Sequence, residues 1–401
     1  MPPEARDPGA GLVLRPFRAT RYGPAVQGNI GTVTSPPYDV INRKTVYRLH
    51  TSHPYNVVRL ILPRRFSDTN SYDDVDVRLR EWQRSQVLVE DSEPGLYAYE
   101  YTVGAHTVRG LVGALGLRDP ASGIVLPHEG VMPGPVNDRA ELIARTRTNL
   151  EPILLVYDGG GAASDVVDEV TDEQRIIDTV APDGSRHTVW RITDAATLAD
   201  VARDLAPRRA LIADGHHRYE AYRQVQSSGT GPEFDFGLAM LVDQQRYPLQ
   251  LGPIHRVVRD LSLDELRGRA LEGTTVKDFG GDPAAAAEAA ADAASARAAF
   301  VVSDGQRWAV VTADRAPAEI DTHVLHERLL PAWDVEEKVM LYVHNPEHAV
   351  AEARAHNGVA MLVRPPSVAA VVAAAEQGRT LPRKSTSFGP KPRMGLLMRV
   401  F

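Results

Sequence analysis

The stretch "ALIADGHHRYEAYRQ", from Ala210 to Gln224, decides the fold because it changes its hydrophobic pattern in the middle. The apolar run Ala210–Ala213 is typical of a buried strand, and the residues from Tyr219 onward follow a helical period. Between them lies DGHHR, with Gly215 at the expected turn. The sequence therefore predicts a strand, a tight turn and a helix at this place.

The composition on either side of this stretch is that of a folded protein of more than one domain. The chain has 401 residues, of which 43% are hydrophobic and 24% charged, which is close to the average for globular proteins. We expect a mixed α/β fold with a strand-rich N-terminal domain over residues 1–205 and a C-terminal α+β domain over residues 206–401 that carries DGHHR and a basic tail. Polar motifs occur in both halves, so we expect the two to share one cleft.

Charge and residue usage exclude several classes of protein. The formal net charge is −7, so the whole molecule repels duplex nucleic acid, and we expect none as a partner. No apolar window is long enough for a membrane span, and the first residues lack the layout of a secretion signal, which predicts a cytoplasmic protein. Cysteine is absent, so a metal would have to be held by His, Asp or Glu.

The DGHHR turn has the residues that a phosphate site needs. Gly215 lets the backbone approach a ligand closely, and the start of a helix favours an anion. His216 and His217 can donate hydrogen bonds or protons near neutral pH, and Arg218 can hold two phosphate oxygens. Asp214 would accept a hydroxyl proton, orient a metal or fix a histidine tautomer. The alternative is that Asp214 only caps the helix and that the histidines make local contacts.

Other polar residues in Gly- and Pro-rich turns are further candidates. Glu129, beside His128 in "LPHEG", is a candidate second acid. Tyr38 and Asp39 follow the rigid Pro36-Pro37 pair. The candidates for holding a phosphate or an anionic substrate are His128, Arg139, Tyr38, Asp39, His255, Arg256, Lys384, Ser385 and Lys391. For each of them the alternative is an ordinary turn, a structural histidine or a solvated charge.

Several motifs together resemble one family along nearly the whole chain. "ADGHHRYEAY" is similar to the signature of the family called domain of unknown function 1015, and "SPPYDVI", "HPYNVVRL", "LPHEGVM", "LGPIHRVV" and "KSTSFGPKP" are similar to its other blocks in the same order. More distantly, the strand–DGHHR–helix element resembles the core loop of the ParB/sulfiredoxin-like superfamily. That superfamily includes nucleotide-binding partition proteins and free serine kinases, and the resemblance implies an acid that acts on the substrate hydroxyl, at Asp214, and phosphate-binding His and Arg residues.

These observations favour a small-molecule phosphotransferase. It would move a phosphoryl group from a nucleotide or pyrophosphate to a hydroxyl of a serine-like metabolite, or catalyse the related phosphatase reaction, with Asp214, His216, His217 and Glu129 as catalytic residues. Mg²⁺ is the expected helper, with ligands that the sequence does not identify. The alternative is a nucleotide-binding switch of the ParB type that turns over no small molecule.

Overall fold

The computed structural model describes residues 11–26, 28, 30–66, 71–228, 231–269, 271–316 and 319–401. The first ten residues, on which the expectation of no secretion signal rested, lie outside this range. The chain forms two compact units, and each is described by itself. Unit 1 consists of Met1–Pro127, Val131–Leu249 and Pro390–Phe401, and unit 2 of His128–Gly130 and Gln250–Gly389.

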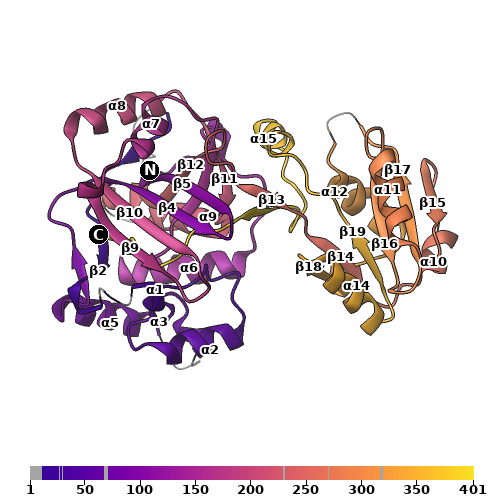
Figure 1. The fold of residues 1–401 in the computed structure, drawn as a ribbon, viewed down its shortest axis with the longest axis horizontal. Helices are drawn as coiled ribbons and strands as arrows, with labels where there is room; N and C mark the ends of the chain where they lie inside the picture. Colours follow the sequence, from indigo (N-terminus) through magenta and orange to yellow (C-terminus); the bar gives the residue numbers. More distant parts are fainter. Residues whose placement is uncertain are drawn as a thin grey trace. The chain divides into compact units, whose positions relative to one another are not determined.

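Unit 1 is built on one mixed sheet with the strand order β6-β11-β8-β12-β5-β4-β10-β9, and β1 pairs with β5 (Figure 1). Its strands are β1 Leu14–Arg15, β2 Thr20–Tyr22, β3 Leu88–Glu90, β4 Leu96–Val103, β5 His106–Gly116, β6 Val125–Leu126, β7 Thr148–Asn149, β8 Ile153–Tyr157, β9 Arg175–Val180, β10 Arg186–Ile192, β11 Ala210–Asp214, β12 Phe236–Asp243 and β21 Arg399–Val400. Its helices are α1 Ile30–Val33, α2 Arg43–Ser52, α3 Val58–Ile61, α4 Pro63–Phe66, α5 Tyr72–Arg84, α6 Pro133–Thr146, α7 Ala162–Asp168, α8 Ala195–Leu205 and α9 His216–Ser228.

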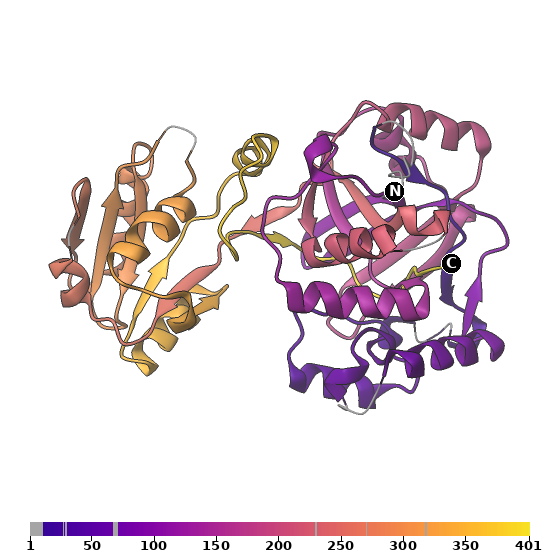
Figure 2. The ribbon, with the colours of Figure 1, turned by 180° about the vertical axis from the view of Figure 1, so that it is seen from behind.

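The core of unit 1 explains why its central strands are apolar throughout. Alternate residues of β8 and β12 join side chains of α6, α7, α8 and α9 in one hydrophobic cluster, and the other residues of β8 are buried on the opposite face. Strands covered on both faces lose the in-and-out alternation of a half-exposed strand. Figure 2 shows α6 lying alongside this sheet.

The last twelve residues belong to unit 1, and their backbone pairs with earlier segments of the same unit. Ser35 forms an isolated bridge with Met394, Thr20 forms one with Met398, and β21 pairs with β7. This return of the chain places Lys391 and the loop around Tyr38 in the same unit as β11.

Unit 2 has an antiparallel sheet of order β15-β17-β16-β19-β14-β18, and β13 pairs separately with β20. The strands are β13 Gln250–Gly252, β14 His255–Val258, β15 Thr274–Asp278, β16 Ala298–Ser303, β17 Trp308–Ala313, β18 Met340–Val343, β19 Val359–Leu362 and β20 Ser387–Gly389. The helices are α10 Leu263–Gly268, α11 Pro283–Ala293, α12 Asp321–His323, α13 Leu330–Ala332, α14 Pro346–Ala355 and α15 Val368–Glu376, with a π-helical turn over Val324–Leu329.

The mixed α/β class is confirmed, as is the strand–turn–helix around Gly215. The run "HPYNVVRLILPRR" departs from its sequence pattern: β-branched residues between two prolines predict a buried strand, but the run forms α3 and α4. The Asn56 amide group donates to the carbonyls of Thr32 and Thr34, and its oxygen accepts from the amide of Val58. This side chain therefore holds the start of a helical turn where the apolar run alone favoured a strand.

The boundary between the two compact units does not lie between residues 205 and 206, where the sequence analysis placed the domain boundary. Strand β12 pairs with both β5 and β8, so β11, α9 and β12 belong to unit 1 together with the first half of the chain. The division into domains 1–205 and 206–401 stays a prediction about which parts fold independently.

Candidate functional site

The turn between β11 and α9 requires glycine. Gly215 has a φ of +96°, and a Cβ atom at this position would lie 3.1 Å from the guanidinium of Arg218. Arg218 lies in the first turn of α9, and its side chain reaches back to Asp214 at the end of β11. The first main-chain bond of the helix is from Tyr219 to the Gly215 carbonyl, at 2.9 Å.

Asp214 is held between two cations at the end of β11. Its Oδ2 accepts from Nη2 of Arg218 at 2.5 Å, and its Oδ1 is ion-paired with Nζ of Lys391. The residue is 8% exposed. Burial alone would lower the pKa of Lys391, but the carboxylates of Asp214 and Asp39 outweigh it and raise this pKa. Lys391 therefore stays charged at neutral pH.

The guanidinium of Arg218 makes its hydrogen bonds with groups of the protein itself. It is 3% exposed, and Nη1 donates to the Pro152 carbonyl at 2.5 Å. Its Nε is buried without a hydrogen-bond partner among the described residues. Burial opposes its charge, yet the carboxylates of Asp214, Glu151 and Asp39 raise its pKa overall. In this arrangement Arg218 positions Asp214, and its direct contact with a phosphate stays a prediction.

Lys391 is more accessible than Arg218 and is held in place by its own loop. Its side chain is 20% exposed, and Nζ lies 3.5 Å from Oδ2 of Asp39, whose side chain is 33% exposed. Prolines flank it at positions 390 and 392, and the hydroxyl of Tyr101 donates to the Pro390 carbonyl at 2.7 Å. Asp39, Lys391 and Asp214 thus form a chain of alternating charges, which we call the Lys391 cluster.

A buried carboxylate that the sequence analysis missed lies behind this cluster. Oε1 of Glu151 accepts from the amide of Tyr38 at 3.2 Å, and Oε2 lies 3.7 Å from Nη1 of Arg139. Burial raises the pKa of Glu151, and the nearby Arg218 and Arg139 oppose this. The guanidinium of Arg139 lies over the ring of Tyr38, 4.9 Å from its centre. The available signal was a single acid two residues before β8, whose residues are all buried.

The two histidines of DGHHR differ in their contacts. Nε2 of His217 accepts from the amide of Met132 at 3.1 Å, which puts the ring proton of a neutral His217 on Nδ1. This bond ties the segment before α6 to the first turn of α9. His216 is the first residue of α9 and is half-buried. Their catalytic roles stay predictions.

Four other predicted residues come together in unit 2. Nε2 of the fully buried His128 lies 2.7 Å from the hydroxyl of Thr386, and Oε1 of Glu129 accepts from the amide of Lys384 at 3.0 Å. Lys384 has a φ of +58°, and the Ser385 hydroxyl donates to a carbonyl of its own loop at 2.5 Å. The tail and the "LPHEG" turn therefore meet, which the separate sequence motifs did not reveal.

His255 and Arg256 are also in unit 2 and are buried. Nδ1 of His255 accepts from the amide of Val363 at 3.2 Å. Arg256 is 0% exposed, and its Nε donates to Nε2 of His326 at 3.0 Å. Burial lowers the pKa of Arg256 to about 10, against the raising effect of Tyr342. These contacts are structural, and a binding role for either residue stays a prediction.

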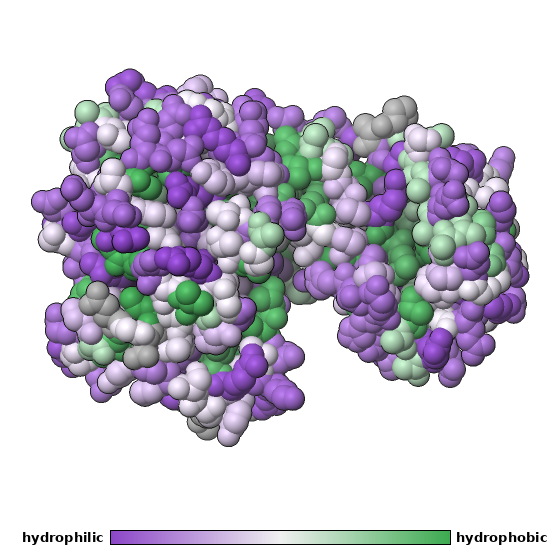
Figure 3. All heavy atoms as spheres, viewed as in Figure 1, coloured by the Kyte–Doolittle hydropathy of each residue, from purple (hydrophilic) through white to green (hydrophobic). Residues whose placement is uncertain are grey.

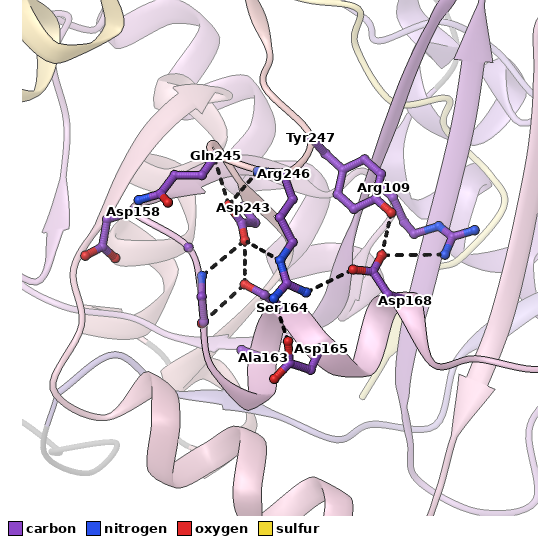
Figure 4. Close-up of polar contacts among 12 residues, drawn as sticks. Arg109, Asp158, Ala163, Ser164, Asp165, Asp168, Asp243, Gln245, Arg246 and Tyr247 are labelled. Carbon is purple, nitrogen blue, oxygen red and sulfur yellow. Dashed lines mark hydrogen bonds and ion pairs between the residues drawn. The ribbon is translucent and has the colours of Figure 1, made fainter.

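A second polar network in unit 1 is shown in Figure 4. It lies where β8 and β12 end, at the opposite end of the sheet from Asp214, because β11 runs antiparallel to β8. Oδ2 of Asp243 accepts from the Ser164 hydroxyl at 2.6 Å and from the amide of Gly160 at 3.1 Å, and Oδ1 accepts from the amides of Gln245 and Arg246. The glycine-rich loop over residues 159–161 therefore encloses the chain's own carboxylate where a phosphate loop would hold its ligand.

Two features are absent from the described part of the chain. No group of three or more His, Asp or Glu side chains is arranged to hold a metal ion there. Over the same residues, no helix combines the length and the apolar character that crossing a membrane requires. Figure 3 shows mostly hydrophilic side chains on the face it presents.

These features define a mixed α/β protein with an ionic cluster at a strand–helix turn. The chain belongs to the family described as "Protein of unknown function (DUF1015)", which matches residues 14–335. No curated protein matches it.

Solved structures match this chain at low sequence identity and with low TM-scores. A free serine kinase variant in complex with ADP is 14% identical, with a TM-score of 0.39, and the match covers 66% of this chain and 84% of that chain. Free serine kinase in complex with AMP is 15% identical, with a TM-score of 0.38, over 66% and 83% of the two chains. SbnI from Staphylococcus aureus, with a C-terminal truncation, is 12% identical, with a TM-score of 0.39, over 72% and 87%.

Proposed function

We propose that the protein is a small-molecule phosphotransferase that moves a phosphoryl group from a nucleotide or pyrophosphate to the hydroxyl of a serine-like metabolite. The observation that carries this proposal is the Lys391 cluster, in which one accessible ammonium lies between the carboxylates of Asp39 and Asp214 beside the start of α9. Phosphoryl transfer requires charge neutralisation, alignment and an acceptor for one proton, and these groups can supply all three. The proposal rests on these contacts and on the DGHHR resemblance, not on the structural neighbours.

In this proposal Lys391 contacts the transferred phosphoryl group. Its ammonium is pre-positioned by Asp214 and by the flanking prolines, so little reorganisation is needed when charge builds up on the phosphoryl oxygens. The positive end of the α9 dipole adds to this attraction. Arg218 acts indirectly, because it fixes the carboxylate that fixes Lys391.

The proton of the acceptor hydroxyl goes to Asp39. Both oxygens of Asp214 already face cations and its side chain is 10% exposed, so a hydroxyl reaches that carboxylate less easily, although the sequence pattern assigned it this role. Asp39 lies 3.5 Å from Nζ of Lys391, and its side chain is 33% exposed. The hydroxyl oxygen then bonds to phosphorus, the bond from phosphorus to the donor oxygen breaks, and the donor leaves as the shorter nucleotide or as phosphate. With water as the acceptor, the same groups would serve a phosphatase.

The charges of the side chains around the proposed site favour a role for Mg²⁺. Asp39, Asp214 and Glu151 face Lys391, Arg218 and Arg139, and Arg139 is also bonded to Asp138, so these groups carry no net positive charge for a phosphate. A bound Mg²⁺ would supply the extra positive charge on the phosphate oxygens, and in such sites it commonly takes only one or two protein carboxylates. Asp39 is the more exposed carboxylate of the Lys391 cluster and would be the one in reach.

The test is a phosphorus NMR assay of the purified protein with ATP, ADP or pyrophosphate, Mg²⁺ and a panel of hydroxyl-bearing metabolites. We expect one donor and one acceptor to give a new phosphomonoester signal, and Asp214→Asn to lower its rate by about 100-fold or more. Asp178→Asn is the matched control, since Asp178 is exposed and pairs with Arg186 on the surface. Nucleotide binding without turnover of any acceptor would contradict the proposal and favour the nucleotide-binding switch.

A further inference from the structure

A pocket of unit 1 lies beside the Lys391 cluster. It has a volume of about 280 Å³, and its polar lining consists of Tyr38, Tyr72, Arg64, Asp138 and Arg139. The apolar wall comes from the turn between α3 and α4 and from the start of α6. Pockets for drug-sized ligands begin at about 300 Å³, so a small metabolite fits a pocket of this size.

The pocket presents two opposite charges close together. Nη1 of Arg64 lies 3.8 Å from Oδ1 of Asp138, and the two side chains are 41% and 38% exposed. Arg64 also makes two hydrogen bonds with Glu141, at 2.9 and 3.0 Å, and lies over the ring of Tyr72, 4.0 Å from its centre. An exposed ion pair of this kind contributes little stability, so a ligand can compete with Glu141 for Arg64.

Asp138 is held as a fixed anion. The hydroxyl of Tyr72 donates to Oδ1 at 2.5 Å, and Nη2 of Arg139 donates to Oδ2 at 2.7 Å. Burial would raise the pKa of Asp138, but Arg139 and the bond from Tyr72 outweigh it and lower this pKa. Each carboxylate oxygen accepts more than one hydrogen bond, so Asp138 can still bind a donor from the pocket.

We propose that this pocket binds a small zwitterion of the α-amino acid class, with its carboxylate on Arg64 and its ammonium on Asp138. An α-amino acid carries its two charges on one carbon atom, and Arg64 and Asp138 offer the complementary pair at a matching short separation. A simple amine leaves Arg64 without a counter-charge from the ligand, and a simple carboxylate leaves Asp138 without one.

The pocket adjoins the proposed phosphate site through two consecutive residues. Tyr38 lines the pocket, and the carboxylate of Asp39 lies 3.5 Å from Nζ of Lys391. A hydroxyl on the side chain of a bound amino acid would therefore approach Asp39. As an acceptor site the pocket rests on the proposed function, but as a binding site it does not.

The experiment is titration calorimetry of the full chain with L-serine, ethanolamine and glycerate, which carry both charges, only the ammonium and only the carboxylate. A charge-assisted hydrogen bond is worth ~1.5–3 kcal/mol, so we expect ethanolamine and glycerate to bind at least about tenfold more weakly than serine. We expect a similar loss for serine with Arg64→Gln, and none with Arg186→Gln, which alters a surface arginine paired with Asp178 at 2.7 Å.

Three results would overturn the proposal: no binding of serine, equal binding of either single-charge analogue, or unchanged serine binding to Arg64→Gln. Serine binding with the expected dependence on both charges, but without phosphoryl transfer, supports the pocket and contradicts the proposed function. Phosphoryl transfer to an acceptor that lacks one of the charges, at the rate seen with serine, contradicts the pocket and leaves the proposed function intact.

Discussion

Replacing Lys391 with methionine separates its part in the reaction from its part in stability. Methionine keeps most of the apolar stem and removes the ammonium that is ion-paired with Asp214 and lies 3.5 Å from Asp39. Asp214 keeps its bond from Arg218, so its carboxylate is not left without a partner. We therefore expect a folded variant.

The expected cost in stability follows from the contacts of the lysine. A hydrogen bond to a charged group contributes ~1.5–3 kcal/mol, and the 20% exposure of Lys391 favours the lower part of this range. A unit of this size shifts its melting temperature by roughly 2–4 °C per kcal/mol, which predicts a loss of roughly 3–8 °C. The effect on turnover is larger, because removal of one pre-positioned charge from a reacting site typically costs ~10²–10³ in rate.

The assay combines scanning calorimetry with initial rates of phosphomonoester formation by phosphorus NMR. Lys338→Met is the matched control, since Lys338 is 74% exposed and, among the residues that the structure describes, is ion-paired with the exposed Glu336 alone, at 2.6 Å. A Lys391→Met protein that keeps the wild-type rate would refute the reasoning, and so would a Lys338→Met protein that loses as much activity.

The same variant makes a prediction about pH. The carboxylates raise the pKa of Lys391 above its ordinary value of 10.5, so its contribution to stability is complete below pH 10.5 and is lost as the pH rises through the raised value. The difference in unfolding free energy between wild type and Lys391→Met should shrink in that alkaline range. A difference that stays constant or grows there would contradict the assigned ion pairs.

Three further substitutions test the surrounding structure. Gly215→Ala should destabilise the protein by ~1–3 kcal/mol and lower turnover, because alanine strains at a φ of +96° and its Cβ crowds Arg218; denaturant unfolding and the rate assay measure both. Burial, reinforced by Arg393, lowers the pKa of His187 from 6.5 to about 4, so on acidification the unfolded chain takes up this proton before the folded chain does. The free energy of unfolding should therefore fall by up to ~1.4 kcal/mol per pH unit as the pH is lowered from 6.5 to about 4. His187→Gln should flatten that slope in urea titrations, and an unchanged slope would contradict the assignment. Asp243→Asn should cost ~1–3 kcal/mol without changing the rate, and a loss of rate at full stability would show that the network in Figure 4 takes part in the reaction.

The sequence predicts an element well where its hydrophobic residues follow a clear strand or helix period, or where a glycine marks its end. The switch around Gly215 is the clearest case, because the period changes where the only residue suited to a φ of +96° stands. The pattern of the run from His53 to Arg65 predicts a strand wrongly, because a short apolar stretch has the same hydrophobic pattern in a buried strand and in a buried helical turn. What decides it is Asn56, whose partners Thr32 and Thr34 are remote in the chain.

The site was partly predictable for a similar reason. Asp214 and Arg218 are only four residues apart, across the turn at Gly215 that the sequence predicted, so their pairing is a local contact. Lys391 was a candidate because of its basic loop, but its partner Asp214 lies 177 positions away, and no local pattern records that distance. Glu151 was missed because its environment is supplied by Tyr38 and other residues from distant segments.

The most direct test of the central claim is a crystal structure of the protein with ADP, Mg²⁺ and inorganic phosphate bound. We predict a phosphate oxygen at hydrogen-bond distance, about 3 Å, from Nζ of Lys391, with Asp39 facing the same ligand. Phosphate density that is confined to another place, such as the glycine-rich loop over residues 159–161, with the Lys391 cluster closed on itself, would contradict the account.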